Sequence, residues 1–273
     1  MNRELSLKEV HGYTLTLIQK LDELCRQLDV KYVVWYGSLL GAIRHKGFIP
    51  WDDDFDVIMP RPDYEKFAAY CRTHEKELGS YRLIDKNTRS DYPYNIARFS
   101  DTIYHMILDG YSDAGMGLFL DVYPFDGIGD DPEQARKKIL WRKKLYAIGW
   151  NSAIRQQAVE TRKGLKEQLV KRLIYLWAKH KSPRYFYRLY DKLADLYSYE
   201  GSSYVTEVVW DMDFVPIKKE WLDDLIRVPF ESITVPVPRA YDTVLTLLYG
   251  DYMTPPPVEQ QVPTHSYRLY IEE

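Results

Sequence analysis

The chain has 273 residues, enough for one large domain or two coupled ones with a substantial buried core. With 45% hydrophobic and 28% charged residues the composition excludes a disordered chain, and no apolar run approaches the ~18 residues of a membrane-spanning helix. The net charge is −3, yet residues 133–192 hold 17 Lys or Arg against 4 Asp or Glu. A basic segment in an otherwise acidic chain indicates an anionic partner.

The cysteines and the N-terminus indicate the compartment. Cys25 and Cys71 fall in helical patterns and form no CxxC motif, which is typical of buried free thiols in a reducing environment. The first residues, MNRELSLKEVHGY, contain no apolar segment of the kind found in signal peptides. We therefore expect a cytoplasmic protein, and the basic segment extends this expectation to a peripheral position at the inner face of the cell membrane.

Strands and helices are predicted to alternate up to about residue 125. Residues 6–28 have the periodicity of an amphipathic helix, and Ser6 and Glu9 have the spacing of a capping box. The elements that follow are a strand at 31–38, helical turns at 39–47, a strand at 54–60, a helix at 61–74, and strands at 81–86, 94–101 and 117–125. This alternation indicates an α/β layer built around a mixed sheet.

The pattern becomes helical after residue 131. Helices are predicted at 132–148, 165–180 and 183–197, and the last part of the chain returns to short strands with a helix at 240–250. We predict three regions: a catalytic core at 1–130, a basic aromatic-rich helical region at 131–200 on the acceptor or membrane side, and a C-terminal segment at 201–273 that packs back on the core.

Four aspartates stand close together in the stretch FIPWDDDFDVIMPRPDY: Asp52, Asp53, Asp54 and Asp56. Asp54 and Asp56 are two residues apart on a predicted strand, so their side chains point to the same face. Two carboxylates on one face repel each other unless a cation neutralises them, and Mg²⁺ takes such oxygen ligands together with substrate phosphates. The pattern therefore predicts a metal site, with Asp53 facing solvent.

Other interpretations of the acidic run were compared with this one. An acidic run is also typical of a solvated turn. A calcium-binding EF-hand does not fit, because the turn glycine and the final Glu of that loop are missing. A phosphatase with a D-x-D-x-T motif does not fit either, because Val57 and Ile58 follow Asp56.

Two further features support a phosphate site. The motif YGSLLG follows a strand and opens a helix, so Gly37 allows a close backbone approach and the N–H groups near Ser38 and Leu39 suit a phosphate. Asp121 sits within the apolar strand LFLDVYPF, where a lone carboxylate is costly to bury without a partner. A metal shared with the first strand would supply that partner.

Together these motifs resemble a known family. The order of elements is similar to that of the nucleotidyltransferase superfamily: a strand, a Gly-Ser turn, a helix, an Asp-x-Asp strand and a third Asp on a later strand. The blocks YGSLLGAIRHKGFIPWDDDFDVIMPRPDYEKF, FLDVYPFDG and YGDYMTPPP resemble the LicD family and follow its order along nearly the whole chain.

The resemblance implies roles for individual residues. Asp54, Asp56 and Asp121 match the metal-binding carboxylates of the family, and Asp52 is a candidate for a second metal or for orienting the loop. The residues implied on the nucleotide side are Gly37, Ser38, Leu39, Gly41, Trp51 and Arg98. Arg44, bidentate to phosphate, would neutralise the charge that develops during the reaction. The implied cofactor is Mg²⁺ or Mn²⁺, as two ions.

The family also implies a reaction. LicD proteins are similar to cholinephosphotransferases, which move phosphocholine from CDP-choline to a hydroxyl of a cell-surface glycan such as teichoic acid, lipopolysaccharide or capsule, with CMP leaving. A related CDP-alcohol such as CDP-ribitol, as in the fukutin-type transferases, is an alternative donor. An ordinary nucleotidyltransferase that uses NTP, and a non-catalytic binding module, are further alternatives. No nucleic-acid partner is expected, because the remainder of the chain is acidic.

Aromatic residues bear on donor and acceptor binding. A choline headgroup binds in an aromatic box, for which the candidates are Trp35, Tyr36, Trp51, Tyr92, Tyr94 and Trp210. In the basic segment, Lys and Arg interleave with aromatic residues, which suits docking on an anionic leaflet or a phosphate-rich acceptor such as a lipid-linked glycan. A solvated helix bundle with an aromatic core would show the same pattern.

Overall fold

A computed structural model describes residues 2–139, 142–153, 165–191, 197–209, 214–263 and 267–272. Its centre is a mixed sheet, and the α/β fold class predicted from the sequence is confirmed. The sheet has the order β2 (Val33–Val34), β3 (Asp56–Pro60), β7 (Leu118–Gly127), β5 (Ala97–Asp101) and β4 (Tyr81–Ile84), and β8 (Tyr204–Glu207) and β9 (Ile217–Lys218) continue from β7. Within this sheet β3 and β7 run parallel, and the other described pairs are antiparallel.

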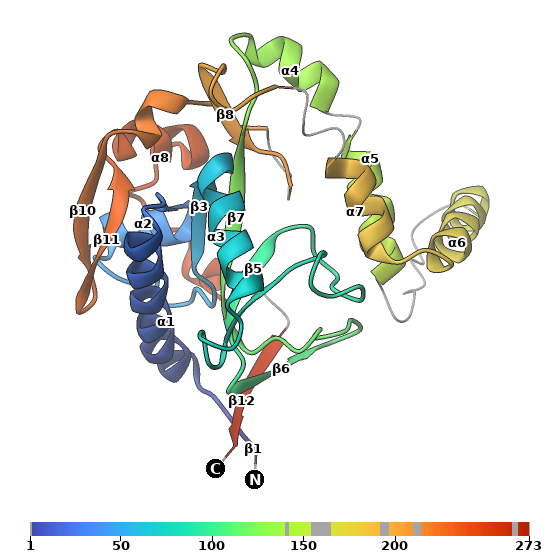
Figure 1. Cartoon of the computed structure of the whole chain (residues 1–273), viewed down its shortest axis with the longest axis horizontal. Coiled ribbons are helices and arrows are strands. Elements are labelled where there is room, and N and C mark those ends of the chain that lie inside the picture. Colours follow the sequence, from blue (N-terminus) through green and yellow to red (C-terminus); the bar gives the residue numbers. More distant parts are fainter. Residues whose placement is uncertain are drawn as a thin grey trace.

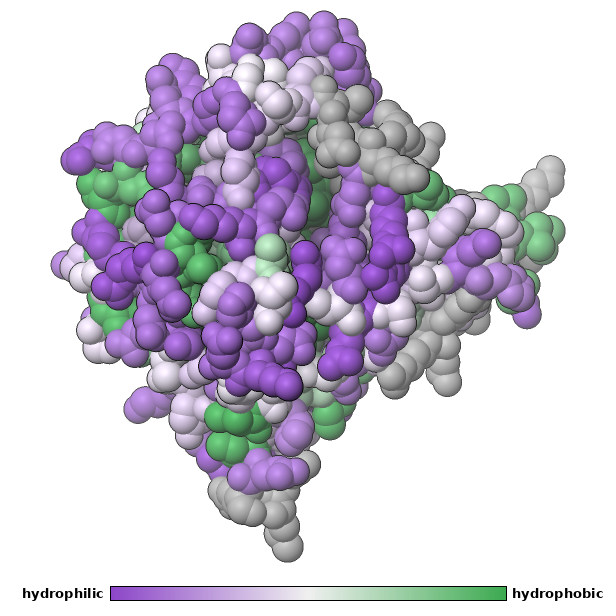
Figure 2. All heavy atoms as spheres, viewed as in Figure 1, coloured by the Kyte–Doolittle hydropathy of each residue, from purple (hydrophilic) through white to green (hydrophobic). Residues whose placement is uncertain are grey.

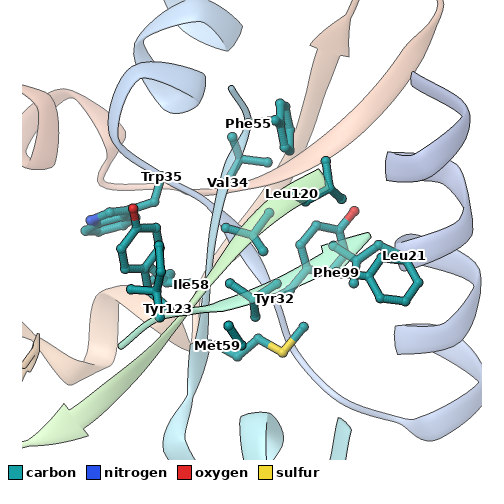
Figure 3. Packing of buried hydrophobic residues seen from close by; sticks show 14 of the residues in the cluster. Leu21, Tyr32, Val34, Trp35, Phe55, Ile58, Met59, Phe99, Leu120 and Tyr123 are labelled. Carbon is teal, nitrogen blue, oxygen red and sulfur yellow. The ribbon is translucent and has the colours of Figure 1, made fainter. Parts of the chain in front are cut away.

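Two long helices cover one face of the sheet. Helix α1 (Leu7–Leu28) begins at the predicted capping box, because Ser6 and Glu9 bond each other's backbone N–H groups. Helix α3 (Arg61–Thr73) follows β3 directly. Both helices pack against β7 (Figure 1). Figure 3 shows Leu120 and Phe99 on the side of the sheet that faces Leu21 of α1.

The opposite face carries the polar side chains that matter below. Residues alternate along β7, so Asp121, Tyr123 and Phe125 point away from Leu120 and Val122. Figure 3 shows Tyr123 beside Trp35 on this second face. It is covered by α2 (Tyr36–Arg44), by α8 (Tyr241–Tyr249), which packs on α2, and by the hairpin of β10 (Leu225–Phe230) and β11 (Ile233–Pro238), which contacts β2 and α2.

A second, three-stranded sheet joins the two ends of the chain. Strand β12 (Tyr267–Glu272) lies between β1 (Asn2–Glu4) and β6 (Tyr104–Leu108), antiparallel to both, and the termini lie side by side in Figure 1. The sequence pattern predicted neither β1 nor β6. Strand β1 is too short for a periodic signal, and the pairing of β6 is with a strand about 160 residues later in the chain.

Four of the described helices lie outside the two sheets, the first near β8 and the other three grouped to one side (Figure 1). They are α4 (Pro132–Ile139), α5 (Arg142–Ala153), α6 (Leu165–Lys179) and α7 (Pro183–Asp191). Helix α5 packs on both α6 and α7, and a Cβ on Gly149 would meet the ring of Tyr187 at 2.6 Å. The Tyr187 hydroxyl donates a hydrogen bond of 2.6 Å to the carbonyl of Pro93, which ties the region to the core. The short 3₁₀ turns are η2 (Lys219–Leu222) and η3 (Val258–Gln260).

Element boundaries differ from the expectations near the acidic cluster. Strand β3 starts at Asp56, so Asp54 lies in the segment before it rather than on the strand. The strand at 31–38 is shorter than predicted because a helix begins after Trp35. The N–H of Trp35 still bonds the carbonyl of Asp56, but the N–H of Leu39 bonds the carbonyl of Trp35. Gly37 and Ser38 are therefore helical residues.

The cysteines agree with the expectation of free thiols. Cys25 and Cys71 are both buried and unbonded, and burial raises the pKa of each thiol. Among the described residues no helix combines the length and apolar character needed to cross a bilayer.

Candidate metal centre

Three charged residues lie in one row across the central sheet. The parallel pairing of β3 with β7 sets Asp56 opposite Asp121, and the antiparallel pairing of β5 with β7 sets Arg98 opposite the same Asp121. The proposal that the third aspartate lies beside the Asp-x-Asp strand is confirmed by this register. Cross-strand neighbours on one face are within contact distance, so the row brings two acids and one base together.

The predicted carboxylates converge. One oxygen each from Asp54, Asp56 and Asp121 lie within 4.8 Å of one another. A second group of the same kind consists of Asp52, Asp53 and Asp54. The two groups share Asp54, and Asp53, which belongs to the second group, is partly exposed.

Asp56 is the most constrained of these acids. It is 6% exposed, and its N–H donates a hydrogen bond of 2.9 Å to Oγ of Ser38. Burial, followed by the charges of Asp54 and Asp121, raises the pKa of Asp56 well above its ordinary value, although a hydrogen bond from Tyr123 opposes the rise. Among the described residues, no donor reaches its Oδ1. A buried carboxylate oxygen without a partner is costly, and a cation bound here would offset that cost.

Arg98 partly compensates the charge. Its Nε donates to Oδ1 of Asp121 at 2.7 Å, and both side chains are 4% exposed. The guanidinium lies between the rings of Tyr94 and Phe119, 4.0 and 3.9 Å from their centroids. The predicted phosphate contact of Arg98 stays a prediction, and the structure pairs this guanidinium with the carboxylate of Asp121.

The turn residues divide into two groups. A Cβ on Gly37 would meet Oδ2 of Asp52 at 2.7 Å, so this glycine lies directly against the acidic segment. Ser38 reaches the same region through Asp56. Leu39 is fully buried in the core, and a Cβ on Gly41 would meet the carbonyl of Gly47 at 2.5 Å. The structure therefore gives Leu39 and Gly41 packing contacts, and the nucleotide role predicted for all four residues stays a prediction.

Arg44 and Trp51 lie on the half-buried rim of this region. Nη1 of Arg44 donates to the carbonyl of Tyr252 at 2.8 Å, which links α2 to the loop after α8. Trp51 meets the ring of His45 edge-on, with the centroids 6.2 Å apart. Neither contact tests the predicted phosphate and nucleotide roles.

Two tyrosines near the carboxylates were not singled out from the sequence. Burial and the charges of Asp56, Asp52 and Asp54 raise the pKa of Tyr249, although 42% of the residue is exposed. Tyr267 of β12 donates a hydrogen bond to the carbonyl of Asp53 and packs on Phe119. A signal existed for Tyr249, because it opens the block YGDYMTPPP, but none for Tyr267.

The aromatic candidates for a choline box are separated by burial. Trp35 and Tyr92 are at most 1% exposed and Tyr94 is 8% exposed, so these rings belong to the core. Tyr36 and Trp51 are half-buried, and Tyr36 meets Tyr123 edge-on at 5.4 Å. Trp210 lies outside the described residues.

The donor set fits the implied metal. Hard carboxylate oxygens from three positions, one of them buried without a partner in the described part of the chain, suit Mg²⁺ or Mn²⁺. Acids that converge on two adjacent parallel strands and on the segment before the first of them, next to the first turn of a helix, are typical of a nucleotidyltransferase-type fold, and they form a candidate metal site.

Comparison with known proteins shows what the chain is similar to. Residues 29–144 match the family model described as LicD/FKTN/FKRP, nucleotidyltransferase domain. The lipopolysaccharide cholinephosphotransferase LicD of Haemophilus influenzae is 29% identical over 286 residues, which cover 98% of this chain and 99% of that protein. An uncharacterized protein of Rickettsia typhi is 46% identical over 67 residues, 24% of this chain and 21% of the relative.

Proposed function

We propose that the protein is a phosphotransferase that moves phosphocholine from CDP-choline to a hydroxyl of a lipopolysaccharide-type glycan precursor and releases CMP. The observation that carries the proposal is the convergence of Asp54, Asp56 and Asp121 around a buried carboxylate oxygen that has no partner among the described residues. The similarity to the Haemophilus influenzae enzyme along 98% of the chain supports the choice of choline.

In the proposed reaction one phosphorus–oxygen bond forms and another breaks. The acceptor oxygen forms a bond to the phosphorus that carries choline, and the bond from this phosphorus to the CMP oxygen breaks. The hydroxyl proton leaves to solvent. Catalysis of such a transfer is mostly positioning and charge stabilisation, so the protein must hold a diphosphate and a hydroxyl in line.

The residues would divide this work. Asp54, Asp56 and Asp121 would hold Mg²⁺, and the two carboxylate groups that share Asp54 leave room in the proposal for two ions. When bound, the metal supplies a counter-charge to the diphosphate and lowers the pKa of the hydroxyl. Arg98 fixes the orientation of Asp121 through its hydrogen bond, and Ser38 fixes the backbone of Asp56 in the same way. Arg44 would neutralise charge on the leaving CMP.

Recognition of choline needs aromatic faces that are not buried in the core. Tyr36 and Trp51, both half-buried, and the exposed Tyr249 remain candidates after Trp35, Tyr92 and Tyr94 are removed by burial. Teichoic acid or capsule as acceptor, and a cytoplasmic position at the inner face of the membrane, belong to the same proposal.

Calorimetric titration tests the donor. The protein is titrated with CDP-choline, CDP-ribitol and CTP, each with and without Mg²⁺. We expect Mg²⁺-dependent binding of CDP-choline well above the other two. A preference for CDP-ribitol would keep the mechanism and change the transferred group, whereas a preference for CTP would contradict phosphocholine transfer and indicate an ordinary nucleotidyltransferase.

Turnover tests the metal centre. CMP release from CDP-choline is followed with purified lipopolysaccharide as acceptor. Asp54→Ala and Asp56→Ala should each retain less than about a tenth of the wild-type rate. Asp109→Asn, which changes an exposed aspartate on the rim of β6, is the matched control and should be unaffected. Full activity in either cluster variant would contradict the assignment.

A further inference from the structure

Helix α6 presents a row of large apolar side chains to the outside of the molecule. Each of these residues is more than half exposed: Leu169 59%, Val170 55%, Leu173 58%, Leu176 51% and Trp177 56%. Their spacing of i, i+1, i+4, i+7 and i+8 places them on one side of a helix. This set is called the apolar face of α6. A contiguous apolar face of this kind on a soluble domain marks an interaction surface.

The helix is held by its other side. Ala178, which the helical period places opposite the centre of this face, is fully buried, and α5 packs against α6. The ring of Trp177 also contacts Phe186 of α7, with 5.7 Å between the ring centroids, so one end of the apolar face packs on α7. Figure 1 shows α6 at the edge of the molecule, far from the central sheet, and Figure 2 shows hydrophobic atoms at the same place.

Positive charge surrounds the apolar face. Residues 165–191 contain seven Lys or Arg and two Asp or Glu. Arg172 is exposed, and the helical period places it on one flank of the face. Lys181, also exposed, lies just beyond the end of α6 at Lys179. A helix that combines an apolar face with Lys or Arg flanks and an aromatic residue lies in the boundary between lipid headgroups and acyl chains.

From these observations we infer that α6 docks the protein on an anionic lipid leaflet, with the apolar face inserted between headgroups and the basic flanks on lipid phosphates. The charge distinguishes this occupant from a second copy of the chain. A two-fold contact through the same face would set the basic flanks of both copies against each other, which is unfavourable. An anionic leaflet instead supplies charge of the opposite sign to every flank.

The role of this docking rests on the proposed function, because a protein bound to a leaflet can reach a glycan acceptor that is anchored in the same leaflet. The binding itself needs neither donor nor metal. It can therefore be measured separately from CMP release, and each of the two can fail alone.

Co-sedimentation of the full chain with vesicles tests the inference. Vesicles of phosphatidylcholine alone are compared with vesicles that contain about a third phosphatidylglycerol, at low and high salt. In the variant Leu169→Gln/Leu173→Gln, both changes lie on the apolar face and remove no core residue. The matched control Ile103→Gln/Val258→Gln changes residues of 52% and 77% exposure outside the basic region. A third variant, Arg172→Gln/Lys181→Gln, removes the flanking charges.

We expect salt-sensitive binding to the anionic vesicles that is weakened about tenfold in the leucine variant and unchanged in the control. The charge variant should lose the preference for anionic over neutral vesicles. Circular dichroism and CMP release with a delipidated acceptor should be unchanged in all three variants, which excludes misfolding as the cause.

Two results would overturn the inference. One is equal binding by the leucine variant and the wild type. The other is no binding of the wild type to anionic vesicles, and a concentration-dependent dimer lost in the leucine variant would then identify a second copy as the occupant. Loss of CMP release in the wild type with intact vesicle binding would count against the proposed function alone.

Discussion

Strand β7 carries two buried aspartates, Asp121 and Asp126, whose surroundings differ. Asp126 is 6% exposed and accepts two hydrogen bonds, of 2.6 and 2.7 Å, from one guanidinium, that of Arg61. Asp121 is 3% exposed, accepts one bond from Arg98, and stands beside Asp56. The charge of Asp126 is balanced by Arg61, whereas Arg98 stands against the combined charge of Asp121 and the acids beside it. An excess of buried charge, and not burial of an acid as such, marks the candidate site.

The region around Asp126 shows what matched charge looks like. Asp126 lines a cavity of about 470 Å³ together with Arg61, Lys86 and Asp191. Nζ of Lys86 donates to Asp191 at 2.5 Å and to Asn95 at 2.6 Å. Burial lowers the pKa of Lys86 even though Asp191 opposes the shift. Each charge in this group has a partner of opposite sign, so we assign the group to stability.

Removing each arginine compares the two ends directly and should give the largest effects. Arg98→Met leaves Asp121 ionised beside other carboxylates, and we expect a loss of about 3–5 kcal/mol in the free energy of unfolding. Arg61→Met should cost less, about 2 kcal/mol, because Asp126 does not stand beside a cluster of other carboxylates and the partner that it loses is 27% exposed. Urea unfolding at neutral pH without divalent ions measures both.

Added Mg²⁺ sharpens this first prediction. The ion should restore stability to Arg98→Met more than to Arg61→Met, because a ligand that binds the native state stabilises it, and only the first variant has lost a cation of the carboxylate centre. Equal recovery of both variants would mean that the two ends of β7 do not differ in charge balance.

Replacing the most constrained acid should separate activity from stability. In Asp56→Asn, CMP release should fall more than about a hundredfold, or about 2.7 kcal/mol in the barrier. The metal-free Asp56→Asn variant should unfold at a higher temperature than the metal-free wild type. Burial and the charges of Asp54 and Asp121 raise the pKa of Asp56, so the ionised carboxylate lowers the stability of the native wild type above the ordinary pKa of this group. Calorimetry in a chelator and a turnover assay give the two readings. A lower unfolding temperature would indicate that Asp56 is compensated after all.

The opposite result is expected at the other end of the strand. Asp126→Asn should lower the free energy of unfolding by about 2 kcal/mol, because a neutral amide replaces the buried carboxylate that accepts two hydrogen bonds from Arg61. CMP release per folded molecule should stay within about a factor of two, since the side chain points to the other face of the sheet from Asp121. A hundredfold loss of turnover with little change in stability would instead place Asp126 in the active site.

The sequence predicts the core of this site because its signals are local. The Asp-x-Asp spacing, the lone Asp121 in an apolar strand and the capping box of Ser6 all lie within short segments. The structure has the capping box and brings the three aspartates together, although Asp54 lies before β3 rather than on it. The contact of Arg98 with Asp121 depends on how β5 and β7 pair across 23 residues, and no local pattern encodes that register.

Other differences have the same physical origin. Periodicity cannot tell an aromatic ring in the core from one beside a ligand, so Trp35 and Tyr92 were grouped with Trp51 as box candidates. Tyr267 reaches the acidic segment only because β12 pairs with β6, and that pairing joins distant parts of the chain. The exposed state of the α6 leucines is likewise a tertiary property, since the same spacing is typical of a helix that faces a core.

Glu9 extends the comparison to an accessible carboxylate. Oε2 of Glu9 accepts bonds from Oγ and the N–H of Ser6 at 2.7 and 2.9 Å, and the bond from the Ser6 side chain, followed by that from its backbone, lowers the pKa of Glu9 from 4.5 to about 2. Here hydrogen bonds favour the charged form, whereas burial disfavours it at Asp56. Ser6→Ala should cost about 1 kcal/mol of stability, the smallest effect considered.

The pH dependence of this last effect has a definite sign. Between pH 4.5 and about 2 the unfolded chain binds the Glu9 proton more readily than the native chain, so the stabilisation is complete above pH 4.5 and is lost as the pH falls through this window. The stability difference between the wild type and Glu9→Gln should therefore be constant near neutrality and shrink toward pH 2, as measured by urea unfolding at each pH. A difference that did not change with pH would show that the capping box acts through its geometry alone and that the charge of Glu9 contributes nothing.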